Sequence, residues 1–416
     1  MRLIHTSDWH LGQHFYGKSR ANEHQQFLIW LLTQVTENNV DAVIVAGDIF
    51  DTATPPSYAR EMYFDFIAKI HQLNCQLIII AGNHDSVAML AESKQVLNHL
   101  STHVIALANN DLNEQVITLT DQQGDPSAII CAIPFIRPRD ILVSKAGQSA
   151  SQKQQNLQQA ISDYYQKNIN FARQLQEQYK SSVPIIATGH LTTVGASCSE
   201  SVRDIYIGTL EAFPANAFPH VDYIALGHIH RAQKIAKTEH IRYSGSPIAL
   251  SFDEAKQTKQ VFMVDFEEGK LARVKSLSIP CFQPLAILKT NLTNLTIDIE
   301  QLLLEFATQL KNDPIKIWLD IEINSEQYLQ DLQQRIEVII KEFPIEIIRI
   351  RRSKKKSKLI LAKQAKITLN ELSETDVFQQ RLALETWETA NDESRKKRLN
   401  LLFMQVLAEV KAEQKQ

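Results

Sequence analysis

Histidine, aspartate and asparagine residues follow directly after several short apolar stretches of this chain. The segments are Asp8-Trp9-His10, Gly47-Asp48-Ile49-Phe50-Asp51, Gly82-Asn83-His84-Asp85, Gly189-His190 and Gly227-His228-Ile229-His230. Carboxylate and amide oxygens together with imidazole nitrogens suit manganese, iron or zinc better than magnesium or calcium, which prefer all-oxygen shells. Any one of these short motifs is usually a turn, but five in order after strand-like stretches predict a metal centre.

The candidate ligands are too many for one ion. They are Asp8, His10, Asp48, Asn83, His190, His228 and His230. A tetrahedral site takes four ligands, so this set predicts two ions. Asp48 is the natural bridge, because one carboxylate can span two ions about 3.5–4 Å apart. Such a pair clamps a phosphate and lowers the pKa of a bound water, so the expected chemistry is phosphoester hydrolysis.

The elements that position these residues are expected to be short buried strands alternating with helices. Nearly all-apolar strands are predicted at residues 3–6, 41–46, 76–81, 184–188 and 222–226, with helices at 23–36, 57–72 and 149–179. This alternation indicates an α/β layered core. Ligands of α/β sheets gather at the carboxyl ends of strands, so the five strand ends should form one cleft. The glycines before the ligands permit tight turns and close backbone approach.

The pattern changes after Pro280. Residues 315–323 alternate apolar and polar side chains, a helix is predicted at 325–342, and a second strand at 345–350. This indicates a small α+β domain. A basic run and two amphipathic helices end the chain.

Composition bounds the function. The net charge of −3 gives no global positive field, so nucleic-acid binding would depend on local patches or on a partner. Four widely spaced cysteines argue against zinc ribbons and disulfide frameworks. No signal-peptide core is present and no apolar run approaches the ~20 residues of a membrane span, so we expect a cytoplasmic protein.

The motifs resemble those of the calcineurin-like metallophosphoesterases, and more closely those of the SbcD-type nuclease subunits of bacterial SbcCD complexes. The resemblance lies in HTSDWHLGQHFYGKSR, VAGDIFDTATPPSYAR, AGNHDSV, ATGHLTTVGAS, RDIYIGTL, YIALGHIHRAQ, YSGSPIALSFDE and the segment from Leu372. It implies a four-layer β-sandwich flanked by helices at residues 1–280. It also implies an α+β domain that caps DNA at 281–352, and a basic linker with partner-binding helices at 353–416.

The resemblance also assigns roles to residues. It implies a first metal bound by Asp8, His10, Asp48 and His230, and a second bound by Asp48, Asn83, His190 and His228. His84 would contact the scissile phosphate as general acid, oriented by Asp85; a histidine beside two cations can exchange a proton near neutral pH. Some relatives have histidine where this chain has Asp51, which leaves open whether Asp51 contacts phosphate or supports a metal ligand.

The activity that the resemblance implies is Mn²⁺-dependent cleavage of DNA in repair and recombination. It would act as a 3′ to 5′ exonuclease on duplex ends and as an endonuclease on single strands and hairpins. The implied partner is an SbcC-type ATPase with a long coiled coil, and two copies of this chain would pair within a heterotetramer. The alternatives are a small-molecule phosphoesterase and a P-loop ATPase or non-catalytic assembly subunit.

The P-loop alternative arises because residues 12–19 fit the pattern GxxxxGKS. Two features oppose nucleotide binding: Asp8 and His10 separate the loop from its strand, and bulky Phe15 and Tyr16 stand where amides would wrap phosphates. We expect the loop to border the DNA path instead, with Lys18 and Arg20 near phosphates. His5 and His220 are expected to be core or surface histidines.

Two further features suggest binding surfaces. The basic cluster comprises Arg349, Arg351, Arg352, Lys354, Lys355, Lys356 and Lys358, and it is either a solvated linker or a contact to the DNA backbone. The last helix carries an apolar stripe of Leu399, Leu402, Phe403, Val406, Leu407 and Val410. That stripe would dock either on the chain's own body or, as the resemblance favours, on the partner.

Overall fold

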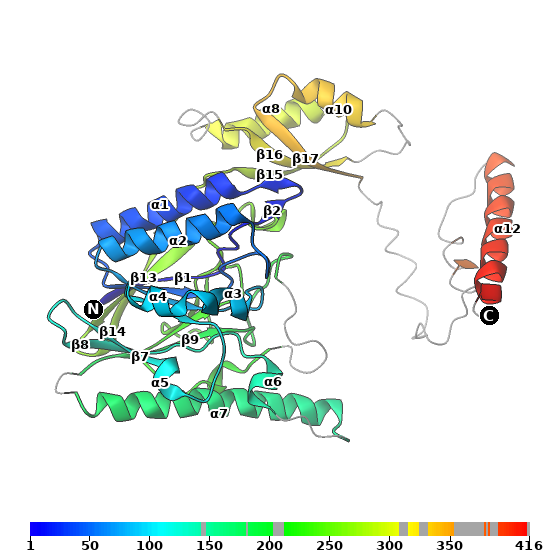
Figure 1. The fold of residues 1–416 in the computed structure, drawn as a ribbon. Helices are drawn as coiled ribbons and strands as arrows, with labels where there is room; N and C mark the ends of the chain where they lie inside the picture. The colour runs from blue at the N-terminus through cyan, green and yellow to red at the C-terminus, as the bar shows by residue number, and fades with distance from the viewer. Residues whose placement is uncertain are drawn as a thin grey trace. The chain divides into compact units, whose positions relative to one another are not determined.

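The computed structural model describes residues 1–142, 147–179, 182–202, 212–307, 315–323, 332–352, 378–379, 382 and 390–413. The chain divides into two compact units. The first comprises residues 1–323 and 327–351, and the second comprises 324–326 and 352–416. The first unit holds two large sheets, their helices and a small α+β domain (Figure 1).

The first large sheet has the order β14-β13-β1-β4-β5-β6. Its strands are Lys270–Ser278, Gln260–Glu267, Arg2–Thr6, Ala42–Ala46, Gln76–Ile80 and Thr102–Ile105. Strands β1, β4, β5 and β6 are parallel to one another, whereas β13 pairs antiparallel with β1 and with β14. The first three strands that the sequence predicted are confirmed here.

The second large sheet has the order β11-β12-β10-β9-β8-β7. Its strands are Gln233–Lys234, Ile241–Tyr243, Tyr223–Gly227, Ile185–His190, Pro126–Cys131 and Val116–Thr120. The four central strands are parallel and the two edge strands are antiparallel to their neighbours. The predicted strands at 184–188 and 222–226 are therefore confirmed, but they belong to a different sheet from the first three.

Each apolar strand is buried on both of its faces. In β4, Ile44 packs in a core shared with Ile130 and Ile186 of the second sheet, while Val43 and Val45 point to the opposite side. There they meet helices α1 (Ala21–Glu37) and α2 (Ser57–Gln72), which lie side by side in Figure 1. Since successive side chains of a strand point to opposite faces, a strand between two cores is apolar throughout.

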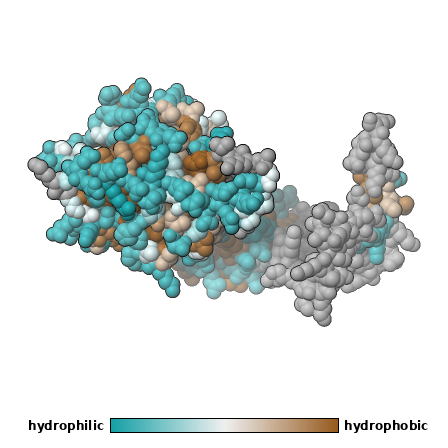
Figure 2. Space-filling model, turned by 90° about the horizontal axis from the view of Figure 1, so that it is seen from below, coloured by the Kyte–Doolittle hydropathy of each residue, from teal (hydrophilic) through white to brown (hydrophobic). Residues whose placement is uncertain are grey.

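Helix α7 (Ala150–Gln176) covers the outer face of the second sheet. Its inner side buries Leu157, Ile161 and Tyr165, and its outer side is rich in glutamine. Figure 2, viewed from below, shows a mostly hydrophilic surface on this side of the molecule. The predicted peripheral helix is confirmed. The short helices are α3 (Val87–Glu92), α4 (Lys94–Asn98), α5 (Leu112–Gln115), α6 (Pro138–Ile141), η1 (Ala215–Ala217) and η2 (Phe252–Glu254).

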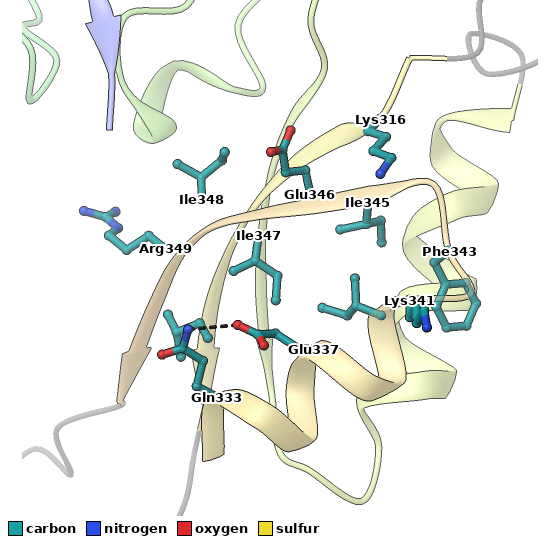
Figure 3. Close-up of a pocket in the computed structure, with 12 residues that line it drawn as sticks. Lys316, Gln333, Glu337, Lys341, Phe343, Ile345, Glu346, Ile347, Ile348 and Arg349 are labelled. Atoms are coloured by element: carbon teal, nitrogen blue, oxygen red, sulfur yellow. Dashed lines mark hydrogen bonds between the residues drawn. The ribbon is translucent and has the colours of Figure 1, made fainter. Parts of the chain in front are cut away.

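The small α+β domain contains the sheet β15-β16-β17 and two helices. Its elements are β15 (Leu285–Thr290), α8 (Leu295–Glu305), β16 (Ile317–Ile323), α10 (Leu332–Ile340) and β17 (Ile345–Arg352). Both predicted strands and the described part of the predicted helix are confirmed. A cavity of about 600 Å³ lies along β17 and α10 (Figure 3), where Gln333 donates to Glu337.

A β-hairpin between β1 and α1 packs against the small domain. Strands β2 (His14–Phe15) and β3 (Lys18–Ser19) pair around Tyr16 and Gly17, which both have positive φ, as a tight hairpin turn requires. Phe15 packs with Phe252, Leu285 and Trp318. The GxxxxGKS pattern therefore forms a hairpin with a buried aromatic side chain, which does not have the strand-loop-helix form of a phosphate-binding loop, and the P-loop interpretation is wrong.

The second unit is built on helix α12 (Ala390–Glu413). Phe378 stacks on Phe403 with ring centroids 3.9 Å apart, and Gln379 donates to Asn400. Leu399, Leu402 and Val406 are 37%, 49% and 54% exposed within this unit. The Val410 side chain lies outside the described residues. None of the described helices is long and apolar enough to cross a membrane.

Candidate metal centre

The carboxyl ends of strands from both large sheets bring the predicted ligands together. Their potential donor atoms form three clusters within 4.8 Å: Asp8, His10 and His230; His10, Asp48 and His84; and Asp48, His190 and His228. The Asn83 Oδ1 atom lies 3.0 Å from His190 Nε2 and 3.1 Å from His228 Nδ1. All seven side chains that the sequence proposed as ligands therefore lie around one point.

Asp48 is at the centre of this arrangement. Its Oδ2 atom lies 3.2 Å from His190 Nε2 and 3.6 Å from His10 Nε2, so histidines of two different clusters approach the same carboxylate. Its Oδ1 atom accepts a hydrogen bond of 2.9 Å from the His84 amide. Asp48 is 1% exposed. A carboxylate held between two groups of donors has the geometry of a bridging ligand.

The backbone is strained where it carries these side chains. Asp8, His10, Asp48 and His228 all have φ between 48° and 97°, the left-handed region that side chains with a Cβ rarely adopt. Each such residue costs on the order of 1–3 kcal/mol and persists only where its surroundings enforce it. Strained backbone at four candidate ligands supports the prediction that this is a functional site.

Two glycines let the chain approach this centre closely. A Cβ at Gly82 would lie 2.1 Å from Asp48 Oδ1, and a Cβ at Gly227 would lie 1.8 Å from the Ala46 carbonyl oxygen. Any larger residue would displace the carboxylate or the strand end. The close backbone approach expected from the glycines is confirmed.

His10 has contacts that are typical of a metal ligand. Its Nδ1 atom is 3.2 Å from an Asp51 carboxylate oxygen, while its Nε2 atom is buried and has no hydrogen-bond partner. A proton on Nδ1 that is donated to Asp51 leaves the Nε2 lone pair free. The donor set thus fits a divalent cation, and Asp51 is placed behind His10 as a supporting carboxylate.

Neighbouring charges set the pKa values of the site. Burial would raise the pKa of Asp48, but the neighbouring His190, His10 and His84 outweigh it and hold this pKa well below its usual range. Burial would likewise lower the pKa of His190, yet the Asp48 carboxylate raises it to about 9. The site therefore keeps an anionic oxygen available at neutral pH, which is what a cation needs.

His84 is oriented by a different group from the one expected. Its Nδ1 atom lies 2.7 Å from the backbone carbonyl oxygen of Asp51, which accepts the Nδ1 proton. The Asp85 carboxylate instead accepts backbone N–H bonds from Gly82, Ile49 and Phe50. Asp85 ties together the loops after β4 and β5, and the prediction that it orients the His84 ring is wrong.

The predicted DNA-contacting cations have varied surroundings. Arg20 is 1% exposed, paired with Glu23 and bonded to the Ala249 carbonyl, so the prediction that it contacts phosphates is wrong. Lys18 pairs with Glu346 of the small domain. The Arg351 guanidinium binds the buried Asp320 carboxylate at 2.7 Å. The Arg352 side chain, Lys354 and Lys355 lie outside the described residues.

One buried network next to His230 was not among the features predicted from the sequence. Ser201, Glu254 and Lys259 lie behind this histidine and are connected by hydrogen bonds. Glu254 is separated from His230 by 24 positions and lies in a turn that no metal motif includes. Only the tertiary structure brings it to the site.

Comparison with known proteins decides the family. A family model described as calcineurin-like phosphoesterase matches residues 1–232, and one described as type 5 capsule protein repressor C-terminal domain matches residues 281–386. The D subunit of the SbcCD nuclease of Escherichia coli (strain K12) is 51% identical over 407 residues, 98% of each chain. This chain belongs to the SbcD family of calcineurin-like phosphoesterases. The resemblance inferred from its motifs is confirmed.

Two further SbcD proteins are less similar to this chain than that of Escherichia coli (strain K12). The protein from Rhodobacter capsulatus is 32% identical over 70% of this chain and 71% of its own length. The protein from Bacillus subtilis is 30% identical over 68% of this chain and 71% of its own. A solved β-glucosidase from Exiguobacterium marinum covers 84% of this chain and 88% of its own at 9% identity, and its TM-score of 0.24 is too low to indicate a shared fold.

Proposed function

We propose that this SbcD-family chain is a DNA nuclease subunit that hydrolyses phosphodiester bonds with two divalent cations. Mn²⁺ is the metal that we expect at both positions. The observation that carries the proposal is the buried Asp48 carboxylate between His10 and His190, with the other candidate ligands around it. Its relatives are named as D subunits of SbcCD nucleases, which supports DNA as the substrate and an SbcC-type ATPase as the partner.

The proposed ligand sets share Asp48. The first cation would be held by Asp8, His10, Asp48 and His230, and the second by Asp48, Asn83, His190 and His228. Such a pair supplies charge neutralisation of the phosphate and activation of a water for in-line attack. Hydrogen bonds behind the ligands keep the donor atoms in place: His190 bonds the Ala46 carbonyl, and the Asp8 carboxylate accepts the His228 amide.

The proton for the leaving oxygen would come from His84. The Asp51 carbonyl accepts the Nδ1 proton of His84, which leaves Nε2 as the atom that can donate to substrate. The His84 amide is bonded to Asp48, so the acid and the proposed bridging ligand move together. Proton donation by a positioned histidine contributes about 10²–10⁴-fold to a rate.

The remaining assignments extend this proposal to the whole chain. Residues 1–280 would form a four-layer phosphoesterase domain, 281–352 a DNA-capping domain, and 353–416 a basic linker with partner-binding helices. Lys18 and Arg351 keep 45% and 40% of their side chains exposed, so DNA phosphates could reach them. Arg352, Lys354 and Lys355 stay predicted DNA contacts from the sequence. Two copies would act in a heterotetramer, with 3′ to 5′ duplex exonuclease and single-strand or hairpin endonuclease activity.

Cleavage assays separate this function from that of a small-molecule phosphoesterase. Purified protein with Mn²⁺ is incubated with an end-labelled DNA hairpin and, separately, with bis-p-nitrophenyl phosphate. We expect hairpin cleavage that is lost in Asp48→Asn and on chelation. Cleavage of the small ester alone would favour the rival function.

A further inference from the structure

Glu254 lies completely buried beside the proposed metal centre. It is 0% exposed and belongs to the turn η2. One carboxylate oxygen accepts from Ser199, at 2.7 Å, and from Ser201. The other accepts from Lys259 and from the Leu250 amide. A buried carboxylate with this many donors is ionised and serves only as an acceptor.

This acceptor fixes the direction of a hydrogen-bond chain that ends on a proposed metal ligand. The Ser201 hydroxyl has one proton, and the Glu254 carboxylate takes it. The Ser201 oxygen lies 2.6 Å from His230 Nδ1 and must therefore accept a proton from that nitrogen. With its proton on Nδ1, neutral His230 carries its free lone pair on Nε2.

We propose that Glu254 is a positioning residue that holds His230, through Ser201, in the tautomer that binds the first cation. The inference rests on the proposed two-cation centre and adds Glu254, which lies outside the five ligand-bearing segments, although the segment YSGSPIALSFDE ends on it. Lys259 supports the same arrangement. It neutralises the charge of Glu254 and donates a hydrogen bond of 3.1 Å to the His230 carbonyl oxygen. Partners of this kind typically change metal affinity 10–100-fold when they are removed.

The test is the binding of Mn²⁺ to the Glu254→Gln variant. Calorimetry measures the affinity of each site, and electron paramagnetic resonance detects the signal of a coupled pair of Mn²⁺ ions. A glutamine can offer its amide NH₂ to Ser201, so the direction of the chain is no longer enforced. We expect the second-site affinity to stay within a factor of three, the first-site affinity to fall 10–100-fold, and the pair signal to vanish at stoichiometric Mn²⁺.

Glu23→Gln is the matched control. Glu23 is also a buried carboxylate, 6% exposed, and its replacement likewise leaves a buried cation, Arg20, without its partner. The Glu23 carboxylate accepts hydrogen bonds from Arg20, which is not a candidate ligand, so both Mn²⁺ sites should remain intact. If Glu254→Gln does not fold, Glu254→Gln with Lys259→Met removes the unpaired charge and should show the same loss of the first site.

The outcomes distinguish failure of the role proposed for Glu254 from failure of the proposed two-cation function. Two intact sites in the Glu254 variants, or equal losses in the Glu23 control, would overturn the role of Glu254 while the two-cation centre stands. A parent protein that binds no pair of Mn²⁺ ions would instead overturn the proposed function itself.

Discussion

At the scale of single residues, the candidate metal centre depends on residues with a positive φ, a backbone conformation that they would rarely adopt without the contacts around them. Asp8, His10, Asp48 and His228 are all in the left-handed region, and the residues around them enforce it. Gly82 is part of that enforcement, because its missing Cβ leaves room for the Asp48 carboxylate. Small changes at this point should therefore act on metal binding before they act on folding.

Gly82→Ala tests this dependence. The added methyl would lie 2.1 Å from Asp48 Oδ1, so we expect Mn²⁺ affinity to fall at least tenfold and stability to fall by about 1–3 kcal/mol. Mn²⁺ titration and thermal unfolding measure the two effects. Gly124→Ala is the control for Mn²⁺ affinity: unlike Gly82 it has a positive φ, and no atom lies within 4 Å of the position that its Cβ would take. Unchanged Mn²⁺ affinity in Gly82→Ala would contradict the account.

His84→Gln separates chemistry from metal binding. His84 is proposed to give a proton rather than to hold a cation, so both Mn²⁺ sites should remain. The rate of DNA cleavage should fall about 10²–10⁴-fold at saturating Mn²⁺. A cleavage rate equal to that of the parent protein would remove His84 from the mechanism.

Residue identities predicted which candidate ligands would come together, but they did not predict the contacts that support these side chains. The motifs around Asp48 and His228 contain both the donor atoms and the glycines that admit them. Arg20 was expected at the surface, but its partner Glu23 and the Ala249 carbonyl hold it inside. Glu23 is only three residues away, but the Ala249 carbonyl is 229 positions away, and the local sequence carries no information on that contact.

At the scale of elements, strands of two separate sheets must be held in register for the site to exist. His5 of β1 makes one such connection, since its ring contacts the Tyr223 hydroxyl at 3.0 Å and the Leu226 carbonyl at 3.2 Å, both on β10. It is fully buried, as expected of a core histidine, and burial lowers its pKa to about 3. The histidine is therefore neutral in the folded protein at pH 5, whereas it is protonated in the unfolded chain.

This difference predicts a loss of stability in acid. Between pH 6.5 and 3 the unfolded chain binds a proton at His5 that the folded protein does not, so stability falls as pH falls, by about 1.4 kcal/mol per pH unit. From pH 7 to 5, His5→Gln should therefore lose about 2 kcal/mol less than the parent protein. Urea unfolding at the two pH values in the presence of chelator measures it. An identical pH dependence in both proteins would refute the assignment.

The strands themselves were predictable and their grouping was not. Apolar runs such as residues 42–46 and 76–80 identify strands covered on both faces, because both of their sides meet a core. Nothing in those runs says that β9 and β10 join a second sheet. That grouping depends on strand pairing across long sequence separations.

At the scale of the whole molecule, the chain combines a unit that carries the metal centre with a second unit built on α12. The exposed apolar side chains of α12 include Leu402 and Val406. Their role in binding the ATPase partner was suggested by family resemblance and stays a prediction. Helical periodicity identifies an apolar stripe, but it cannot identify what covers that stripe.

Leu402→Glu combined with Val406→Glu should abolish co-purification with an SbcC-type ATPase. Mn²⁺ binding and the unfolding temperature of the isolated chain should not change, since both side chains are about half exposed. Gln405→Glu, on an exposed position of the same helix, is the charge control and should retain the partner. Normal association of the double variant would show that this stripe is not the binding surface.

The central claim concerns two cations on one carboxylate, and anomalous diffraction from crystals soaked in Mn²⁺ tests it most directly. We predict two anomalous peaks about 3.5–4 Å apart, one on each side of Asp48, with His10 and His230 at the first and His190 and His228 at the second. A single peak, or no peak at saturating Mn²⁺, would contradict the account.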